Sequence, residues 1–316
     1  MTGALPRSVR RLLREGVLCY LASSHPAGPH VTPVVYAVHG SNVWVTTARR
    51  SVKARTWRRD DRVGGLVRAG DRAVAFAGHV SPHDLLDPAS WPRSVLHAPS
   101  LTRAATAFTT RNARFFAGYA LDAYRVPLAW MPPGRVFAAV SLEQLALIGP
   151  DEVDVPSGRF GGRVKSEATF RAARSGDALR GIPDAVRERI AGVGDAALGL
   201  QGSGPPVVLP ARWQEEGAFV SAVVEGRVLS LGRGGPEVKA SLTIDHASQW
   251  RARAMTGVLV QGDGTIYRIP KLRSGARSAA RIAEKAGVDP DRAAIVRIRP
   301  RRLVWWRGWD SGTVRS

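Results

Sequence analysis

The sequence predicts an α+β protein made of two β-barrels in tandem, each with flanking helices. The chain has 316 residues, which corresponds to about two domains at roughly 150 residues each. Apolar residues make up 44% and charged residues 23%, so the composition is that of a globular protein rather than a disordered one. The same order of strand and helix patterns occurs twice along the chain, which indicates a duplication.

The first half opens with an amphipathic helix and continues with a series of strand patterns. In the helix predicted over residues 5–15, apolar residues three or four apart share one face, and Gly16 is placed to end it. Further helices are predicted over 49–59 and 100–125. Apolar and β-branched runs between turn residues predict strands, the last of them a strand or strand pair; these runs are 17–23, 31–38, 43–47, 63–67, 73–80 and 135–147.

The second half repeats this order after a mixed segment. Residues 149–194 combine glycine- and proline-rich turns with helical stretches at 166–174 and 183–191. A later helix is predicted over 274–286, and Gly262 and Gly264 are expected to close a strand pair. Pro300 predicts a bent edge position in the last strand. The predicted strands are 196–200, 207–213, 218–224, 228–231, 240–245, 255–261 and 293–306.

These patterns divide the chain into three parts. They are a first barrel over residues 1–148, a linker with helices over 149–192 and a second, degenerate barrel over 193–316. Two barrels in one chain are expected to pack together as a pseudo-dimer, and two such chains can in addition associate as a homodimer.

The formal net charge of +20 gives the protein a positive field that attracts anions. The arginines are scattered, however, and neither a basic arm, a zinc-finger spacing nor an RNP-type aromatic pattern occurs. Binding of nucleic acid is therefore not expected, and a groove for a small polyanion fits the charge at least as well.

The remaining composition excludes several classes of protein. The lone cysteine, Cys19, excludes a disulfide within the chain and an all-cysteine zinc site, and we interpret it as a small core residue. His79 and His83 are four residues apart, but Pro82 intervenes, so no metal site is expected. The chain has no apolar run long enough to cross a membrane and no apolar leader, so a cytoplasmic location is expected.

The segment from Pro29 to Val67 carries the most specific signals. Thr46 and Thr47 end a predicted strand, and a loop then leads into a helix. Thr47, Ser51 and Lys53 would gather hydroxyl groups, free backbone N–H groups and an ammonium around one point, a combination that binds phosphate. A lysine in the first turn opposes the helix dipole unless an anion lies nearby. The alternative interpretation is an ordinary serine cap followed by an exposed lysine.

The motifs of this segment are similar to those of the FMN-binding split-barrel family, the pyridoxamine-phosphate-oxidase-like proteins. The resemblance is specific over residues 29–67, extends more weakly over 8–147, and concerns strand order alone over 193–308. The motifs that carry it are Pro29-His30-Val31-Thr32-Pro33-Val34, Thr47 with Ser51-Val52-Lys53-Ala54-Arg55, and Arg59-Asp60-Asp61-Arg62-Val63.

The resemblance implies which residues would bind a cofactor. In this family the Ser/Lys pair contacts the flavin phosphate, while the proline-containing strand and the strand ending in Thr lie along the ring and ribityl chain. True pyridoxamine-phosphate oxidases carry an Arg and a Lys on the second strand, where this chain has Val31 and Tyr36 or Ala37, so that particular activity is not expected. The cofactor-binding residues implied are Val31, Thr32, Pro33, Val34, Thr46, Thr47, Ser51 and Lys53.

By this resemblance we expect a redox protein that binds FMN, with the deazaflavin F420 as the alternative, and passes a hydride or electrons to a small organic acceptor. No catalytic side chain is assigned, because the cofactor carries the hydride chemistry. Between Leu231 and Ala240 the second half lacks the loop and helix of the anion motif, so one cofactor site per chain is expected, in the first barrel and walled by the second.

Three questions stay open on the sequence alone. The chain can instead be a non-catalytic cofactor carrier, sensor or interaction protein, and binding of haem or nucleic acid is a third hypothesis. Trp305, Trp306 and Trp309 either pack between the barrels, which we favour, or stack on a cofactor ring. The sequence names neither the substrate nor the electron donor.

Overall fold

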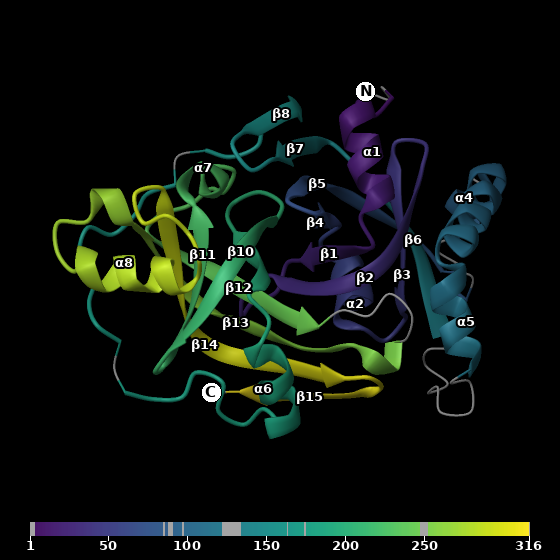
Figure 1. Ribbon diagram of the computed structural model, residues 1–316. Helices are drawn as coiled ribbons and strands as arrows, with labels where there is room; N and C mark the ends of the chain where they lie inside the picture. The colour runs from purple at the N-terminus through teal and green to yellow at the C-terminus, as the bar shows by residue number, and fades with distance from the viewer. Residues whose placement is uncertain are drawn as a thin grey trace.

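The computed structural model describes residues 4–84, 86–87, 91–96, 98–121, 134–162, 164–173, 175–246 and 252–315. Within these ranges the chain forms two closed, six-stranded antiparallel barrels with helices around them (Figure 1). The predicted α+β class with tandem barrels is therefore confirmed.

The first barrel closes in the strand order β4-β1-β2-β3-β6-β5, with β4 and β5 paired. A hairpin of β7 and β8 extends it beyond β5. The strands are β1 (Leu18–Ser23), β2 (His30–His39), β3 (Asn42–Ala48), β4 (Arg62–Ala69), β5 (Arg72–His83), β6 (Arg135–Ser141), β7 (Gln144–Ile148) and β8 (Val153–Ser157).

The second barrel closes in the order β11-β10-β9-β12-β13-β14, with β11 and β14 paired, and β15 extends it beyond β14. Each strand has the same neighbours as its counterpart in the first barrel, so the duplication inferred from the sequence is present in the pairing itself. The strands are β9 (Asp195–Gln201), β10 (Val207–Glu216), β11 (Phe219–Glu225), β12 (Glu237–His246), β13 (Thr256–Arg268), β14 (Ala293–Arg307) and β15 (Asp310–Arg315).

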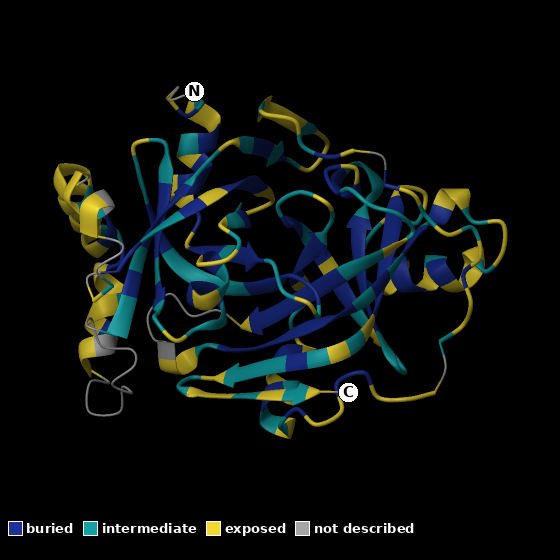
Figure 2. Ribbon diagram, turned by 180° about the vertical axis from the view of Figure 1, so that it is seen from behind, coloured by how far each residue is buried: buried dark blue, intermediate teal, exposed yellow. Residues whose placement is uncertain are grey.

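Most of the helices lie on the outside of the barrels, where Figure 2 shows their exposed faces, while the buried residues largely follow the strands. The described helices are α1 (Arg7–Glu15), α2 (Val52–Trp57), α3 (Trp91–Leu96), α4 (Ala98–Arg111), α5 (Ala113–Leu121), α6 (Asp184–Ala191), α7 (Gly226–Leu229) and α8 (Ala276–Lys285), with short 3-10 turns η5 (Ala252–Ala254) and η6 (Ile269–Lys271). No helix of the described part is long and apolar enough to pass through a lipid bilayer.

The register of the two proline-containing strands shows how closely the halves correspond. Pro33 on β2 lies opposite Tyr20 of β1, and Pro210 on β10 lies opposite Ala197 of β9, at the same place in the pairing. Thr32-Pro33-Val34 and Leu209-Pro210-Ala211 therefore occupy equivalent positions in the two barrels. The same register places Val207 of the second barrel at the position that His30 occupies in the first.

The barrels share one hydrophobic core and are joined by hydrogen bonds. A cluster of buried side chains contains Val31 and Leu66 of the first barrel together with Leu198 and Leu209 of the second. Across the contact, the Thr243 hydroxyl donates to the Val31 carbonyl oxygen at 2.7 Å. The expected intrachain pseudo-dimer is therefore present.

Five predicted elements differ from the structure. Over residues 166–173 the chain is not helical but extended, because Glu167 and Phe170 bond their N–H groups to carbonyls of the second barrel. The strand predicted over 228–231 is replaced by α7 and the turn that follows it, since a short apolar run fits a buried helical turn equally well. The helix predicted over 49–59 is confined to α2.

The two other differences concern glycine and asparagine positions. β13 continues through Gly262 and Gly264 instead of turning. A Cβ at Gly262 would lie 1.9 Å from the Arg299 carbonyl oxygen, so glycine is needed there for the approach of β14 and not for a turn. These glycines therefore permit close strand approach beside a bulge. The helix predicted over 100–125 is split at Asn112 into α4 and α5, and its end lies outside the described residues.

Candidate functional site

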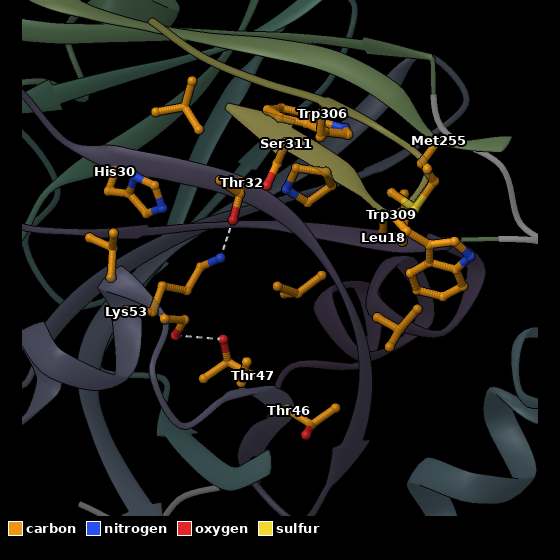
Figure 3. Close-up of a pocket in the computed structure, with 18 of the residues that line it drawn as sticks. Leu18, His30, Thr32, Thr46, Thr47, Lys53, Met255, Trp306, Trp309 and Ser311 are labelled. Carbon is orange, nitrogen blue, oxygen red and sulfur yellow. Dashed lines mark hydrogen bonds between the residues drawn. The ribbon is translucent and has the colours of Figure 1, made fainter. Parts of the chain in front are cut away.

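A cavity of about 500 Å³ lies between the two barrels and is lined by both. The first barrel contributes β2, the end of β3, the start of α2 and residues of α5, while the second contributes β14 and β15. In Figure 3, Thr46, Thr47 and Lys53 lie across the cavity from Trp306 and Ser311. The site is therefore composed of residues more than 200 positions apart in the sequence, brought together by the pseudo-dimer.

Lys53 is the charged group at the base of this cavity. It follows the helix cap Ser51 by two residues, is 5% exposed and lines the cavity. Its Nζ donates a hydrogen bond to the Thr32 hydroxyl on β2. The pKa of Lys53 is lowered from 10.5 to about 8, mainly by burial; Cys19 opposes this shift and the nearby Arg135 contributes to it. Below pH 8 the cavity thus contains a desolvated ammonium that an anion would stabilise.

Hydroxyl groups lie beside this lysine. The Thr47 and Ser51 hydroxyls are 3.0 Å apart, and Ser51 caps α2 by accepting the Ala54 N–H at 3.1 Å. Thr46 accepts from Arg135 Nε at 3.0 Å, which brings a second cation to the cavity. The strand end, the capping serine and the lysine therefore converge as the sequence predicts.

His30 is a buried polar group in the same cavity. Its side chain is 7% exposed, and Nδ1 has no hydrogen-bond partner among the described residues. Burial, followed by the positive charges of Lys53 and Arg302, holds the pKa of His30 well below its ordinary value of 6.5. The imidazole is therefore neutral at physiological pH, with one nitrogen that protein atoms leave unsatisfied.

The opposite wall is aromatic and comes from the β14–β15 hairpin. Trp305, Trp306 and Trp309 line the cavity together with Met255, and Phe115 and Phe116 of α5 border it from the first barrel. Trp305 and Trp306 also pack against the shared core. Packing between the barrels, the interpretation favoured above, is therefore present for Trp305 and Trp306, and all three tryptophans line the cavity, while stacking on a cofactor ring stays a prediction.

Seven of the eight predicted binding residues line this cavity: Thr32, Pro33, Val34, Thr46, Thr47, Ser51 and Lys53. Val31 does not, because its side chain is fully buried in the core shared by the barrels.

The sequence prediction omitted several residues that line the cavity. His30 stood inside the recognised motif without a role, and the proximity of Arg135 to Thr46 required the β3–β6 pairing. Arg302 and Met255 carried no signal, because their position depends on how the second barrel docks onto the first. The lining residues omitted include His30, Phe115, Phe116, Arg135, Met255 and Arg302.

The equivalent place in the second barrel is built differently. A one-turn helix, α7, does occur there, which corrects the expectation that the helix is missing. Its cap is Glu225 in place of Ser51, and Arg227, at the position of Lys53, pairs with Glu225 and donates to the Pro150 carbonyl oxygen. The cationic group is therefore already neutralised.

Linker residues fill the space above α7. Gly161 packs so closely that a Cβ there would lie 2.3 Å from the Ser230 carbonyl oxygen, and its own carbonyl accepts from Arg233 Nε at 2.6 Å. The cavity lined by Gly161, Arg233 and Val207 has a volume of only about 10 Å³. Val207 is the counterpart of His30, so the polar lining is also lost.

No metal centre accompanies the site in the described residues: no group of three or more His, Cys, Asp or Glu side chains among them is placed to hold a metal ion. Cys19 is fully buried, and burial raises the pKa of its thiol to about 12. This environment agrees with its interpretation as a core residue.

The geometry thus defines a duplicated split barrel with one cationic, aromatic-walled cavity. Residues 6–84 match the family model described as pyridoxamine 5'-phosphate oxidase. The first barrel is a pyridoxamine-5'-phosphate-oxidase-like split barrel, which confirms the resemblance indicated by the motifs. No match was found among curated proteins.

Several solved structures are similar over slightly less than half of the chain. A heme binding protein from Mycobacterium smegmatis is 12% identical, with 49% of this chain and 60% of that chain covered and a TM-score of 0.34. A pyridoxamine 5'-phosphate oxidase-related, FMN binding protein from Nostoc punctiforme is 14% identical, with 48% and 89% covered and a TM-score of 0.36. An F420 reductase is 20% identical, with 45% and 98% covered and a TM-score of 0.29.

Proposed function

We propose that the chain binds a phosphate-bearing flavin or deazaflavin between its barrels and transfers a hydride or electrons to a small organic substrate. The observation that carries this proposal is the chemistry of the cavity: cationic groups at one end, an aromatic wall opposite, and no carboxylate among the described lining residues. FMN is the first candidate and F420 the alternative, since both combine a three-ring heterocycle with a phosphate group. The family match over residues 6–84 supports the same assignment.

The residues present fit such a group. The volume of about 500 Å³ lies in the usual range for cofactor sites, about 300–1,000 Å³. Lys53 is buried, and its hydrogen bond in the described structure is to a neutral hydroxyl. His30 Nδ1 is buried without a partner in that same part of the chain. Both groups are costly to bury unless a ligand completes their interactions.

Each part of the cavity then has a role in binding. Lys53 would hold the phosphate, with the hydroxyls of Ser51 and Thr47 beside it. The β2 residues from Thr32 to Val34 would lie along the ring and ribityl chain, and the β14 tryptophans would cover the ring from the second barrel. The bound cofactor supplies the hydride or electron chemistry, and the chain binds it, orients it and excludes water.

The test is a fluorescence titration of the purified apo-protein with FMN and, separately, with F420. We expect saturable binding of one of them well below about 10 µM, which corresponds to a binding free energy of about 7 kcal/mol. The proposal is overturned when neither binds at tens of micromolar.

A second candidate function is a non-catalytic cofactor carrier or sensor. The ion pair of Arg227 with Glu225 in the second barrel supports it, because among the described residues it leaves only the first barrel with an unpaired ammonium at this place in the fold. Reduction of the loaded protein followed by addition of small organic acceptors distinguishes the two. An enzyme reoxidises its cofactor in an acceptor-dependent way, whereas a carrier shows a normal spectrum and no turnover.

The wider assignments remain predictions. They are the division into a cofactor-binding barrel, a linker and a degenerate barrel, the cytoplasmic location and the homodimer. Analytical ultracentrifugation of the purified chain measures its oligomeric state directly, and limited proteolysis tests the linker between residues 149 and 192.

A further inference from the structure

The cationic end of the cavity is completed by an arginine of the second barrel. Arg302 on β14 lines the cavity and donates through Nη1 to the Gln261 side-chain oxygen. Gln261 is fully buried, and its Nε2 donates to the carbonyl oxygens of Gly28 and Pro29. These carbonyls immediately precede His30, so one glutamine joins Arg302 to the strand that carries the unsatisfied imidazole.

This connection depends on a close fit. Gly28 has a φ of 120°, and a Cβ there would lie 2.5 Å from the Ala240 carbonyl oxygen. Only glycine accommodates both the backbone conformation and the contact with β12. The turn is therefore fixed against the second barrel, and with it the relative positions of His30 and Arg302.

The charges around His30 are all positive or neutral. Lys53 of α2, Arg302 of β14 and His25 of the β1–β2 turn each disfavour its protonation. No acidic side chain lines the cavity in the described residues. Lys53 and Arg302, both cationic at neutral pH, and a neutral imidazole thus face one space that holds no counter-ion among the described residues, and such an arrangement favours an anion.

We propose that Lys53, His30 and Arg302 form a single anion subsite that spans both barrels and recognises the phosphate group of the ligand. This inference rests on the proposed function and deepens it, because it makes the second barrel a contributor to phosphate recognition rather than only a wall. The planar guanidinium of Arg302 suits two phosphate oxygens, and the imidazole N–H suits a third. A phosphate monoester and a phosphodiester share this chemistry.

The experiment compares FMN with riboflavin, which has the same ring and ribityl chain but no phosphate. Arg302→Gln is expected to raise the dissociation constant for FMN at least tenfold and that for riboflavin less than twofold. Arg302→Lys, which retains the charge, is expected to recover part of the loss. The matched control is Arg315→Gln, because Arg315 lies opposite Arg302 in the β14–β15 pairing but is exposed and does not line the cavity.

His30 is tested in the same way. His30→Ala is expected to weaken FMN severalfold with little change for riboflavin, and His30→Asn, which keeps a hydrogen-bond donor, is expected to weaken FMN less. Circular dichroism melting confirms that each variant is folded before titration.

The outcomes separate the subsite from the function. Equal losses for FMN and riboflavin, or no loss for either, overturn the subsite while the flavin function stands. If the wild type binds neither FMN nor F420, the function fails, and inorganic phosphate then tests the subsite alone. Phosphate that raises the melting temperature of the wild type but not of Arg302→Gln supports the subsite, and no difference between the two proteins refutes it.

Discussion

At the scale of single residues, the buried ammonium of Lys53 makes the stability of the protein depend on pH. It is buried beside Thr32, and its pKa is lowered to about 8, first by burial and further by Arg135. Its ordinary pKa is 10.5, so between these values the unfolded chain holds a proton that the folded chain releases. The free energy of unfolding therefore rises with pH from about 8 to 10.5, and the protonated lysine is a cost that a bound anion offsets.

Replacing this lysine separates binding from folding. Lys53→Met keeps the length of the side chain and removes the charge. We expect the affinity for FMN to fall by about 1.5–3 kcal/mol, the range for hydrogen bonds to charged groups, while the melting temperature is kept or raised. Calorimetric titration measures the first and thermal melting the second. Lys271→Met is the control, since Lys271 is exposed on η6; unchanged FMN affinity in Lys53→Met would remove the phosphate assignment.

The same residue predicts a pH dependence of binding. The affinity for FMN requires the ammonium form of Lys53, whose pKa in the free protein is about 8. Affinity should be independent of Lys53 ionisation below pH 7 and decrease as the pH rises through 8 towards 9.5, whereas Lys53→Met should show no decrease in this interval. Titrations at half-unit steps of pH measure both curves. Parallel curves for the two proteins would contradict the role of Lys53.

A second buried ionisable group, Asp245, lies at the barrel contact and predicts a pH effect on stability. Burial raises its pKa from 3.8 to about 6, against the opposing effects of a hydrogen bond from Tyr20 and the charge of Arg68. The protonated carboxyl of Asp245 is favoured in the folded protein, so its contribution to the free energy of unfolding is fully present below about pH 4. This contribution is lost as the pH rises through 6 and the buried carboxyl ionises.

Asp245→Asn therefore should stabilise the protein at pH 7.5 by about 1–3 kcal/mol, since a pKa unit corresponds to about 1.4 kcal/mol, and should have little effect at pH 4.5. Thermal or urea unfolding at the two pH values measures this difference. Asp291→Asn, at an exposed position, is expected to change neither. Destabilisation by Asp245→Asn at pH 7.5 would show that the ionised carboxylate has a favourable partner.

At the scale of elements, the barrels meet where glycines allow backbone to approach backbone. A Cβ at Gly64 on β4 would lie 1.9 Å from the Pro206 carbonyl oxygen, which precedes β10. Gly64→Ala must therefore separate the barrels and should destabilise the protein by about 1–3 kcal/mol or more. Gly192→Ala, at the end of α6 with no atom within 4 Å of the added methyl group, should be neutral or slightly stabilising. Urea unfolding compares them; equal effects would contradict the packing.

How far the sequence predicts these elements depends on where each one gets its stability. Strands such as β2 and β12 were predicted because their own apolar and β-branched residues encode them. The extended segment 166–173 was wrongly predicted as a helix and the turn α7 as a strand, because partners elsewhere in the chain determine their conformation. β15 was missed for the same reason: its polar residues pair with β14 only after the hairpin forms.

The site residues, too, were predictable only where they lie within one local stretch of sequence. Lys53, Ser51, Thr47 and Thr32 were predicted because they lie within one local motif, and the β2–β3 pairing and the α2 cap bring them together. The second-barrel residues, Arg302 above all, were not predicted because only the docking of two barrels places them there.

At the scale of the whole molecule, the duplication is symmetric in strand pairing but asymmetric in its sites. The first barrel lines a cavity of about 500 Å³ together with β14 and β15, whereas the small cavity lined by Gly161, Val207 and Arg233 has a volume of about 10 Å³. We therefore predict one cofactor per chain. Absorbance of the saturated, desalted protein against its chain concentration measures this ratio, and a ratio of two would show that the second site opens.

The central claim is that the cofactor's phosphate lies at Lys53 with its ring between the two barrels. A crystal structure of the chain with FMN or F420, whichever binds more tightly, tests it most directly. We expect a phosphate oxygen within hydrogen-bond distance of Lys53 Nζ and the ring between β2 and Trp305 or Trp306. A ligand bound elsewhere, or one bound here with its phosphate far from Lys53, would contradict it.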